Sequence, residues 1–319
     1  MGMTETDTRR ATIDWLLDSD PSIRWQVMRD LTNEPADVVA AERSRIATEG
    51  WGDRLLSLQD SEGKWAGGTY QPKWTSTTNT LALLRVMGLD PASEQATNAL
   101  SQVREKVRWN DHPDAPWAEN TYFAGEVEPC INATVVAIGS YFGQDVQGLI
   151  DRLLGEQLPD GGWNCEAENG STRSSFHTTI NVLEGFLEHE RATGAADVTE
   201  ARLRGQEYLL ERRMFHRLST GEVVDPAWTY FFFPTRWHYD VLRGLDYLRS
   251  AGVVADERCA EAIELVEKRR DEDRRWTMHY SYPGEVHFDM DEEEGQPSRW
   301  ITLGALRVLE WSSGHSTVK

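Results

Sequence analysis

Two stretches of the sequence share one spacing: QDSEGKW at residues 59–65 and QLPDGGW at residues 157–163. Each places a glutamine six residues before a tryptophan, with a glycine-bearing turn between them. A third, degraded copy, VEKRRDEDRRW, ends at Trp276. Spaced copies of one motif indicate a repeat architecture, so the same supersecondary unit is expected around each copy.

After each copy come a polar loop and a segment with helical character. Two of these segments match almost residue for residue, TLALLRV at 80–86 and TLGALRV at 302–308. Similar segments begin at Cys130 and Arg236, and TIDWLLDSD followed by PSIRWQVMRDL forms a first pair. We therefore predict six helical hairpins, whose second helices begin near residues 22, 74, 130, 176, 236 and 299.

The second helix of each hairpin is richer in small and apolar residues than the first helix, which carries the charge. This difference is typical of an inner ring of helices wrapped by an outer ring. We therefore predict an all-α fold, a single α/α toroid or (α/α)6 barrel over residues 1–319, with tails at 1–7 and 313–319. Prolines stand at or just before five of the predicted inner helices, where a missing N–H costs little: Pro21, Pro72, Pro129, Pro234 and Pro297.

The amino-acid composition limits the classes of partner that the protein can bind. The chain of 319 residues has a formal charge of −20 and 39% hydrophobic residues. This acidity argues against nucleic acid and against an anionic membrane surface, because both need basic patches. No apolar run approaches the ~20 residues of a membrane span, and the first residues do not resemble a signal peptide. We expect a cytoplasmic protein without stable membrane insertion, and three cysteines are too few for a disulfide framework.

The glutamine-to-tryptophan repeats resemble the QW motifs of squalene–hopene cyclases. FHTTINVLEGFLEH, from Phe176, resembles the segment of protein prenyltransferase β subunits in which a histidine opens an inner helix and binds zinc. Both families share the α/α toroid, and the whole sequence looks most like bacterial single-toroid proteins described as squalene-cyclase-like or prenyltransferase-like. The resemblance implies an isoprenoid-handling enzyme, terpene cyclase-like or prenyltransferase-like, acting on an apolar or diphosphate-bearing prenyl-type substrate.

Proline, a cation and tryptophan recur together in PSIRW, PKW, FFFPTRW and PSRW. If the inner helices run parallel, all four stretches lie at one mouth of the ring, where helix N-termini add their own positive potential. There Arg24, Lys73, Arg236 and Arg299 would bring positive charge beside Trp25, Trp74, Trp237 and Trp300. Such a mouth suits an anionic head with an apolar tail in an aromatic barrel. The alternative is that each cation only stacks on its neighbouring tryptophan, or pairs with a carboxylate of an outer helix, and so closes the hairpin. The predicted substrate-binding residues are Lys73, Trp74, Phe232, Arg236, Trp237, Arg299 and Trp300.

Metal chemistry is a second hypothesis. Cys130 begins one inner helix, His177 begins the next, and Cys165 lies in the loop between them. Two thiolates and an imidazole would leave a fourth zinc position open, as in a catalytic site, and Asp160, Glu166, Glu168 or a water would complete it. The other ligand positions of the prenyltransferases have no clear match, so only His177 carries over from that resemblance. The alternative is a packed cysteine and a hydrogen-bonded histidine.

Acid chemistry is a third hypothesis. His238 and Asp240 begin an inner helix among aromatic residues, and burial there would raise the pKa of the aspartate and make it a usable acid. These two residues are the predicted catalytic pair, unless His238 only binds a backbone carbonyl. DMDEEEG at 289–295 nearly matches the Asp-x-Asp-Asp motif of protonation-initiated terpene cyclases but is typical of a solvated loop. A non-catalytic toroid that binds a lipid or a protein is the remaining alternative.

Overall fold

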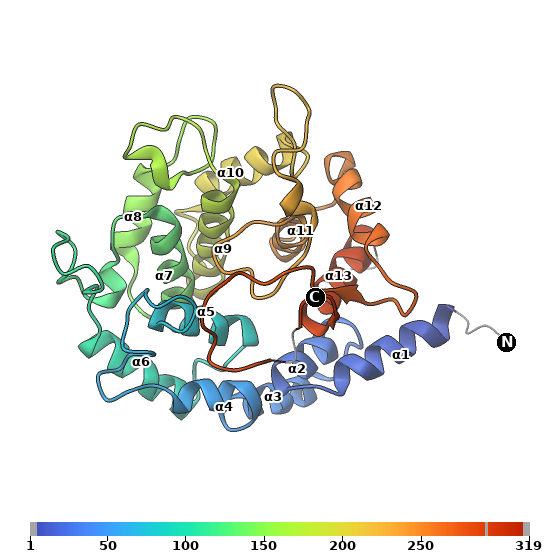
Figure 1. Ribbon diagram of the computed structural model, residues 1–319, viewed down its shortest axis with the longest axis horizontal. Coiled ribbons are helices and arrows are strands. Elements are labelled where there is room, and N and C mark those ends of the chain that lie inside the picture. The colour runs from blue at the N-terminus through green and yellow to red at the C-terminus, as the bar shows by residue number, and fades with distance from the viewer. Residues whose placement is uncertain (1–4, 291–292, 315–319) are drawn as a thin grey trace.

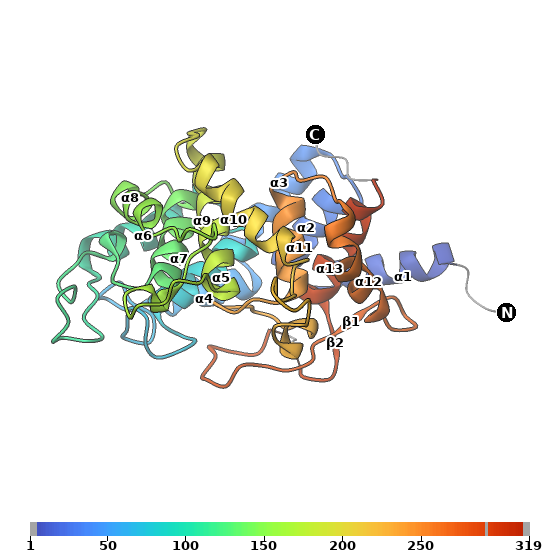
Figure 2. The ribbon, with the colours of Figure 1, turned by 90° about the horizontal axis from the view of Figure 1, so that it is seen from above.

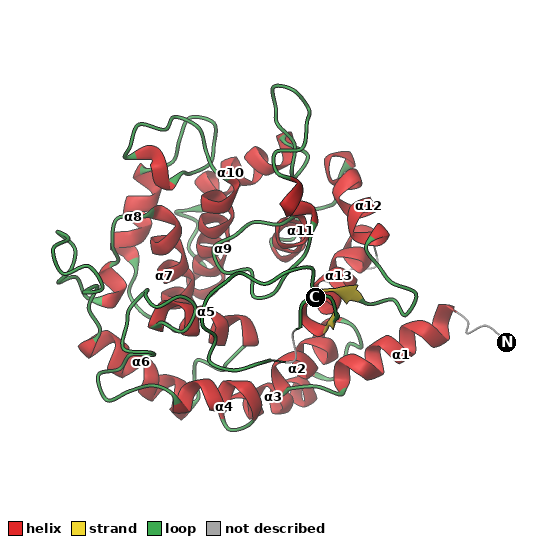
Figure 3. Ribbon diagram, viewed as in Figure 1, coloured by secondary structure: helices red, strands yellow, loops and turns green. Residues whose placement is uncertain are grey.

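The structure is a computed structural model that describes residues 5–290 and 293–314. Within these residues, helices dominate, and the named strands form one two-residue pairing of β1 (Trp276–Thr277) with β2 (Pro297–Ser298) (Figure 3). The predicted all-α class is confirmed.

The helices form two concentric layers around a central axis (Figure 1). The inner layer consists of α2 (Pro21–Asp30), α5 (Thr77–Met87), α7 (Pro129–Tyr141), α9 (Phe176–Thr193), α11 (Val241–Ser250) and α13 (Arg299–Ser312). The outer layer consists of α1 (Glu5–Leu17), α3 (Ala36–Ser44), α4 (Gly50–Ser57), α6 (Glu94–Lys106), α8 (Gln147–Gly155), α10 (Thr199–Glu211) and α12 (Ala260–Lys268). Short 3-10 helices are η1 (Arg45–Ala47), η2 (Tyr122–Ala124), η3 (Cys165–Ala167), η4 (Pro226–Thr229) and η5 (Glu257–Cys259). The described chain therefore alternates between the layers as six hairpins, which confirms the predicted α/α toroid.

Contacts between the first and last hairpins close the ring. Arg307 of α13 donates to the Gln26 side chain of α2 at 2.8 Å and forms an ion pair with Asp30. The indole N–H of Trp25 donates to the Met87 carbonyl at the end of α5, at 2.8 Å. The inner helices thus meet their neighbours on both sides, without an uncovered face at either end of the array.

The inner helices run in the same direction. His177 and His238, near the starts of α9 and α11, have ring centroids 5.6 Å apart. At the opposite ends of α5 and α9, Arg85 forms an ion pair with Glu188 at 2.9 Å. Helix starts therefore gather at one mouth of the ring, here called the N-terminal mouth, and helix ends gather at the C-terminal mouth.

The three repeat tryptophans hold their hairpins in the same way. Each indole N–H donates to a carbonyl ten residues earlier in the outer helix, at 2.6, 2.7 and 2.8 Å for Trp65, Trp163 and Trp276. Each tryptophan backbone N–H donates to a threonine hydroxyl of the following inner helix. The repeat therefore marks the point where the outer helix, the turn and the inner helix are joined.

The repeat glutamines extend this joint to the next hairpin. The Gln59 amide donates to the Gly63 and Ala99 carbonyls, and Gln157 makes the equivalent bonds to Gly161 and Ala201. Each glutamine therefore connects its turn to the next outer helix. This explains the fixed spacing between glutamine and tryptophan, since both must reach buried carbonyls from one turn.

Two of the predicted inner-helix starts were wrong by several residues. α5 begins at residue 77 and α11 at residue 241, later than the predicted 74 and 236. Arg236 has a φ of 54°, outside the helical region, and the Trp74 backbone N–H bonds outside its own hairpin, to Glu285. Of the five prolines, Pro21 and Pro129 are first residues of helices, whereas Pro72 and Pro234 lie in loops and Pro297 in β2. α1 starts at residue 5, inside the predicted N-terminal tail, and the rest of that tail and residues 315–319 of the predicted C-terminal tail lie outside the described residues.

The loops differ in length on the two sides of the ring. Apart from the short link between α1 and α2, connections from an outer helix to the next inner helix are long, and Figure 2 shows them together on one side. They lie at the N-terminal mouth, since each leads into the start of an inner helix. None of the described helices combines the length and the apolar character needed to cross a bilayer.

Candidate functional site

A cavity of about 520 Å³ lies inside the ring and is lined by all six inner helices. It opens at the C-terminal mouth, where lining side chains such as Arg29 (47% exposed) and Val86 (40% exposed) reach solvent. At the other end the lining is aromatic and largely buried, with Phe232, Trp237 and Trp300. The cavity therefore passes from a charged opening to an aromatic floor.

The floor is the segment 231–240, which includes the FFFPTRW stretch. Residues 232–234 and Arg236 line this cavity and also a second one of about 350 Å³. The second cavity is enclosed on its far side by residues 278–290, here called the strap, which Figure 1 shows crossing the ring between α13 and α5. The segment 231–240 is thus a partition between a main cavity and an antechamber.

Bonds to Trp74 hold the strap in place. The Trp74 backbone N–H donates to Glu285 at 2.8 Å, and its indole N–H donates to Pro283 at 3.1 Å. A Cβ at Gly284 would lie 2.7 Å from the Trp74 ring, so only glycine fits there. The Thr80 hydroxyl of α5 also bonds the His287 ring at 2.8 Å. Trp74 therefore supports the strap and lines the antechamber, rather than the main cavity.

Arg243 and two α9 side chains fix the shape of the partition. The Arg243 guanidinium pairs with Glu184 at 2.8 Å and donates to the carbonyls of Arg236 and His238. The Asn181 amide of α9 donates to the Trp237 carbonyl at 2.9 Å, and the Tyr239 N–H donates to Nδ1 of His177 at 2.8 Å. The backbone of residues 236–239 is therefore held by side chains.

Asp240 lies where the partition meets α11 and lines the main cavity with 1% of its surface exposed. Its carboxylate caps α11 by accepting the Arg243 backbone N–H at 2.8 Å. Burial raises the pKa of Asp240 to about 7, although the Arg243 N–H and guanidinium favour the charged form. A carboxylic acid is thus available near neutral pH beside aromatic rings.

His238 does not share this position. Its ring lies between Trp237 and Tyr282, with centroids 3.7 and 3.4 Å away. Burial, His177 and nearby cations lower the pKa of His238 to about 3, so the ring is neutral. His238 is not one of the described residues that line either cavity. The predicted catalytic pair is therefore divided: Asp240 reaches the cavity, and His238 packs between the partition and the strap.

The predicted substrate-binding residues divide in the same way. Phe232, Arg236, Trp237 and Trp300 line the main cavity, and Trp74 lines the antechamber. Arg299 turns outward, donates to backbone carbonyls of Trp15 and Asp18, and stacks on the Trp15 ring, because α1 covers the start of α13. Lys73 lies over the rings of Tyr70 and Trp74 and is not among the residues lining either cavity.

Arg236 belongs to the partition and is the one predicted cation of these stretches that lines the main cavity and the antechamber. Its guanidinium lies 5.1 Å from the Trp74 ring centroid, and no described carboxylate lies within ion-pair distance of it. Burial lowers the pKa of Arg236 to about 10. The structural alternative holds for Lys73, which stacks on its neighbour Trp74, and for Arg24, which pairs with Glu42 of the outer helix α3. Arg236 and Arg299 stack on the more distant tryptophans Trp74 and Trp15 instead of on their own neighbours.

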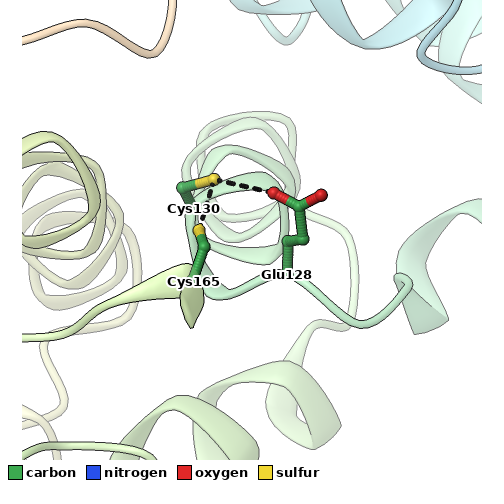
Figure 4. Close-up of side chains that lie close together, drawn as sticks. All are labelled: Glu128, Cys130 and Cys165. Carbon is green, nitrogen blue, oxygen red and sulfur yellow. Dashed lines mark hydrogen bonds between the residues drawn. The ribbon is translucent and has the colours of Figure 1, made fainter. Parts of the chain in front are cut away.

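Cys130 and Cys165 come together as predicted from their positions. Their sulfur atoms are 2.9 Å apart, and Glu128 places a carboxylate oxygen 3.7 Å from the Cys130 sulfur (Figure 4). These three residues form a described group whose donor atoms all lie within 4.8 Å of one another. The hydrogen bond shared by the two sulfurs and burial raise the pKa of Cys130, whereas the same shared bond and the hydrogen bond donated by Thr178 lower the pKa of Cys165.

His177 and Asp160 are not part of this group. His177 uses Nδ1 for the Tyr239 N–H and packs its ring against Trp228 and Trp237, and burial lowers the pKa of His177 to about 4. Asp160 binds the hydroxyl and the backbone N–H of Ser174. The structure therefore agrees with the alternative in which His177 is hydrogen-bonded instead of binding a metal.

Sequence reasoning missed two features of the site. Glu128 stands directly before the proline that begins α7, and its position two residues before Cys130 was the available signal. The arginines of the C-terminal mouth were also missed, because their positions in the last turns of different inner helices look like ordinary helix-end cations.

No family model matches the sequence, and no curated protein matches it. Among solved structures the chain is similar to a protein from Actinoplanes, with 14% identity, a TM-score of 0.48, and coverage of 97% of this chain and 100% of that one. It is also similar to the type II terpene cyclase MstE from Scytonema in its apo form, with 16% identity, a TM-score of 0.47, and coverage of 95% and 96%. An MstE variant in complex with geranylgeranyl dihydroxybenzoate has 15% identity, a TM-score of 0.45, and coverage of 97% and 96%. Function is therefore argued from the residues of the chain itself.

Proposed function

We propose that the protein is an isoprenoid-handling enzyme of the terpene cyclase type, which folds a linear prenyl chain in the main cavity. The observation that carries the proposal is Asp240, a buried carboxyl group with a pKa of about 7 at the aromatic end of the main cavity. A neutral carboxylic acid in that place is suited to donate a proton to an alkene.

The proposed step begins with transfer of the Asp240 proton to a terminal double bond of the substrate. A C–H bond forms from the alkene electron pair as the O–H bond of the acid breaks, and the substrate carries the positive charge. Later loss of a proton from the cyclised cation to water restores the balance, and solvent returns a proton to Asp240.

Aromatic side chains around the cavity would stabilise this charge. Trp25, Phe233, Trp237 and Trp300 line the cavity, and the faces of aromatic rings attract cations. Phe233 and Trp300 are stacked with centroids 4.4 Å apart, which holds both rings in fixed positions. The volume of about 520 Å³ falls in the range of small-molecule sites.

The test is incubation with squalene, linear prenyl diphosphates and the matching prenyl alcohols, followed by mass spectrometry and chromatography of the extracts. We expect a product with the mass of one substrate and a changed retention time, since cyclisation by proton transfer conserves composition. Unchanged extracts with every substrate, from protein with a melting transition, would contradict the proposed function.

A zinc-dependent activity is a second candidate, supported by the Glu128, Cys130 and Cys165 group. Two thiolates and a carboxylate leave a fourth tetrahedral position open, which is the composition of a catalytic zinc site. The sulfur–sulfur distance of 2.9 Å would need to widen toward the ~3.8 Å that two ~2.3 Å zinc–sulfur bonds imply. Thr178, which donates to the Cys165 sulfur at 3.5 Å, would orient that ligand.

Metal analysis tests this candidate. Protein purified without a histidine tag from zinc-supplemented medium is expected to carry about one zinc per chain, and Cys130→Ser and Cys165→Ser should each lose it, because both sulfurs are ligands. Cys259→Ser is the matched control, since Cys259 is buried elsewhere, at the start of α12. His177→Ala should retain the metal. Zinc-free wild-type protein, or full zinc content in Cys130→Ser, would exclude the site.

A further inference from the structure

The C-terminal mouth has more positive than negative charge, although the chain has a net charge of −20. The carboxylates there are already engaged: Asp30 by Arg29 and Arg307, Glu188 by Arg85, and Asp246 by Arg249. Six guanidinium groups line the main cavity toward this mouth, those of Arg29, Arg43, Arg85, Arg191, Arg249 and Arg307. Among the described residues they face these three carboxylates and Glu184, which also lines the cavity, pairs with Arg243 at 2.8 Å and lies 3.9 Å from Arg85.

Arg191 and Arg43 have no described carboxylate within ion-pair distance. Arg191, in the last turn of α9, donates to the backbone carbonyl and hydroxyl of Ser250. Arg43 donates to the Gly88 carbonyl and the Tyr141 hydroxyl, at 2.8 and 2.9 Å. Both guanidinium groups therefore lack an anionic partner in the part of the chain that the structure describes.

These charges act on one another across different helices. Burial lowers the pKa of Arg191, Glu188 opposes the effect, and Arg249, Arg29 and Arg85 lower it further. The guanidinium groups of five inner helices, together with that of Arg43 from α3, therefore line one opening. In addition, the buried Nε–H groups of Arg85 and Arg307 have no hydrogen-bond partner among the described residues.

The simplest explanation is that a cation near the end of a helix stabilises the helix dipole. That effect accounts for one arginine per helix, and Arg104 at the end of α6 is an example on the outer layer. It does not account for arginines that repel one another at the entrance of a cavity, because dispersed positions would give the same stabilisation without repulsion.

We propose that the C-terminal mouth binds the diphosphate group of the substrate, which enters with its prenyl chain directed toward the partition and Asp240. A diphosphate carries several charges and acceptor oxygens, and guanidinium groups bind phosphate oxygens in paired hydrogen bonds. The prenyl part of this statement rests on the proposed function, whereas the diphosphate site does not. The head group would thus bind at the C-terminal mouth, whereas the sequence predicted an anionic head at the N-terminal mouth.

Calorimetric titration with inorganic pyrophosphate, at low and high salt, tests the site. Wild-type protein should bind one pyrophosphate per chain, more tightly than inorganic phosphate or acetate, and raised salt should weaken binding. Arg191→Gln should weaken it by about tenfold or more, the size expected for a lost hydrogen bond to a charged group. Arg191 lies at the rim of the cavity with part of its side chain in solvent, and among the described residues its guanidinium donates hydrogen bonds only to Ser250, so this variant should fold.

Arg104→Gln is the matched control, because it also removes a cation from the last turn of a helix, on the outer layer, and should leave pyrophosphate binding unchanged. Equal affinity of wild type and Arg191→Gln, or no preference for pyrophosphate over acetate, would overturn the proposal. The two proposals can fail separately. Arg191-dependent pyrophosphate binding without any prenyl conversion would support the anion site against the proposed function. Conversion with the same KM in Arg191→Gln would support the function against the anion site.

Discussion

Replacing Asp240 by asparagine is expected to lower turnover of a prenyl substrate at least about a hundredfold, the usual contribution of a positioned general acid. Asparagine has nearly the same shape but cannot donate a carboxylic acid proton. It is also as good an N-cap as aspartate, so the start of α11 keeps its bond to the Arg243 N–H. Loss of activity would therefore not result from loss of the helix cap.

The pH dependence provides an independent check. The folded-state pKa of Asp240 is raised to about 7 from the ordinary 3.8, so activity should be high below pH 7 and fall as the acid ionises above it. For stability, a raised carboxyl pKa contributes fully below the unfolded pKa, and the contribution is lost as the pH rises through the folded pKa. Wild type should therefore lose stability between pH 5 and pH 9, whereas Asp240→Asn should not. The free energy of unfolding of the variant minus that of wild type should increase over this range.

Asp256→Asn is the control for this experiment, because Asp256 also caps a helix, η5, from an exposed position outside the cavity. It should retain wild-type turnover. Asp240→Asn with more than a tenth of wild-type turnover would remove Asp240 from the mechanism. A folded Asp240→Asn protein that binds substrate but does not convert it would support the assignment.

Trp163→Ala is expected to lower the free energy of unfolding by about 3–5 kcal/mol, the usual cost of deleting a large buried aromatic ring. Trp163 is fully buried, donates its indole N–H to the Leu153 carbonyl at 2.7 Å, and packs edge-on against Phe186. A Cβ at Gly205 would lie 2.7 Å from the same ring, which shows how closely the next outer helix approaches it. Denaturant unfolding followed by circular dichroism measures the change.

The matched control is Trp117→Ala, in the loop before α7. Trp117 is only half-buried, and its ring contacts that of His112. Its removal should cost less than about 1 kcal/mol, in the range of partly exposed substitutions. Similar losses for the two variants would show that the repeat tryptophan is not a special joint between the layers.

The repeats made the fold predictable because they encode local and periodic contacts. Trp65 and Trp163 each reach back ten residues, and their glutamines reach the next outer helix, so the sequence spacing reflects the geometry directly. The starts of α5 and α11 were harder to place. There the backbone is held by distant segments, such as the strap at Trp74 and Arg243 at the partition, and no local pattern reports such contacts.

The candidate site was predictable only in part, for the same reason. Equivalent positions at helix starts become neighbours when the ring closes, which correctly brought Cys130 near Cys165 and placed Asp240 at the cavity. Side-chain direction within a turn is not encoded by that position. His177 therefore points to Tyr239 instead of the thiols, and Arg299 points outward to α1.

The closed ring also has a consequence for how the chain reaches its native state. In an open stack of hairpins, the first and last units need a specialised polar outer side. Here Arg307 and Gln26, 281 positions apart, cover each other's helices instead. Loop-closure entropy makes contacts between such distant positions costly to form before the intervening chain is ordered. During synthesis, the inner side of α2 therefore stays uncovered until α13 has left the ribosome, and this interval is when the nascent chain is most exposed to aggregation and proteolysis.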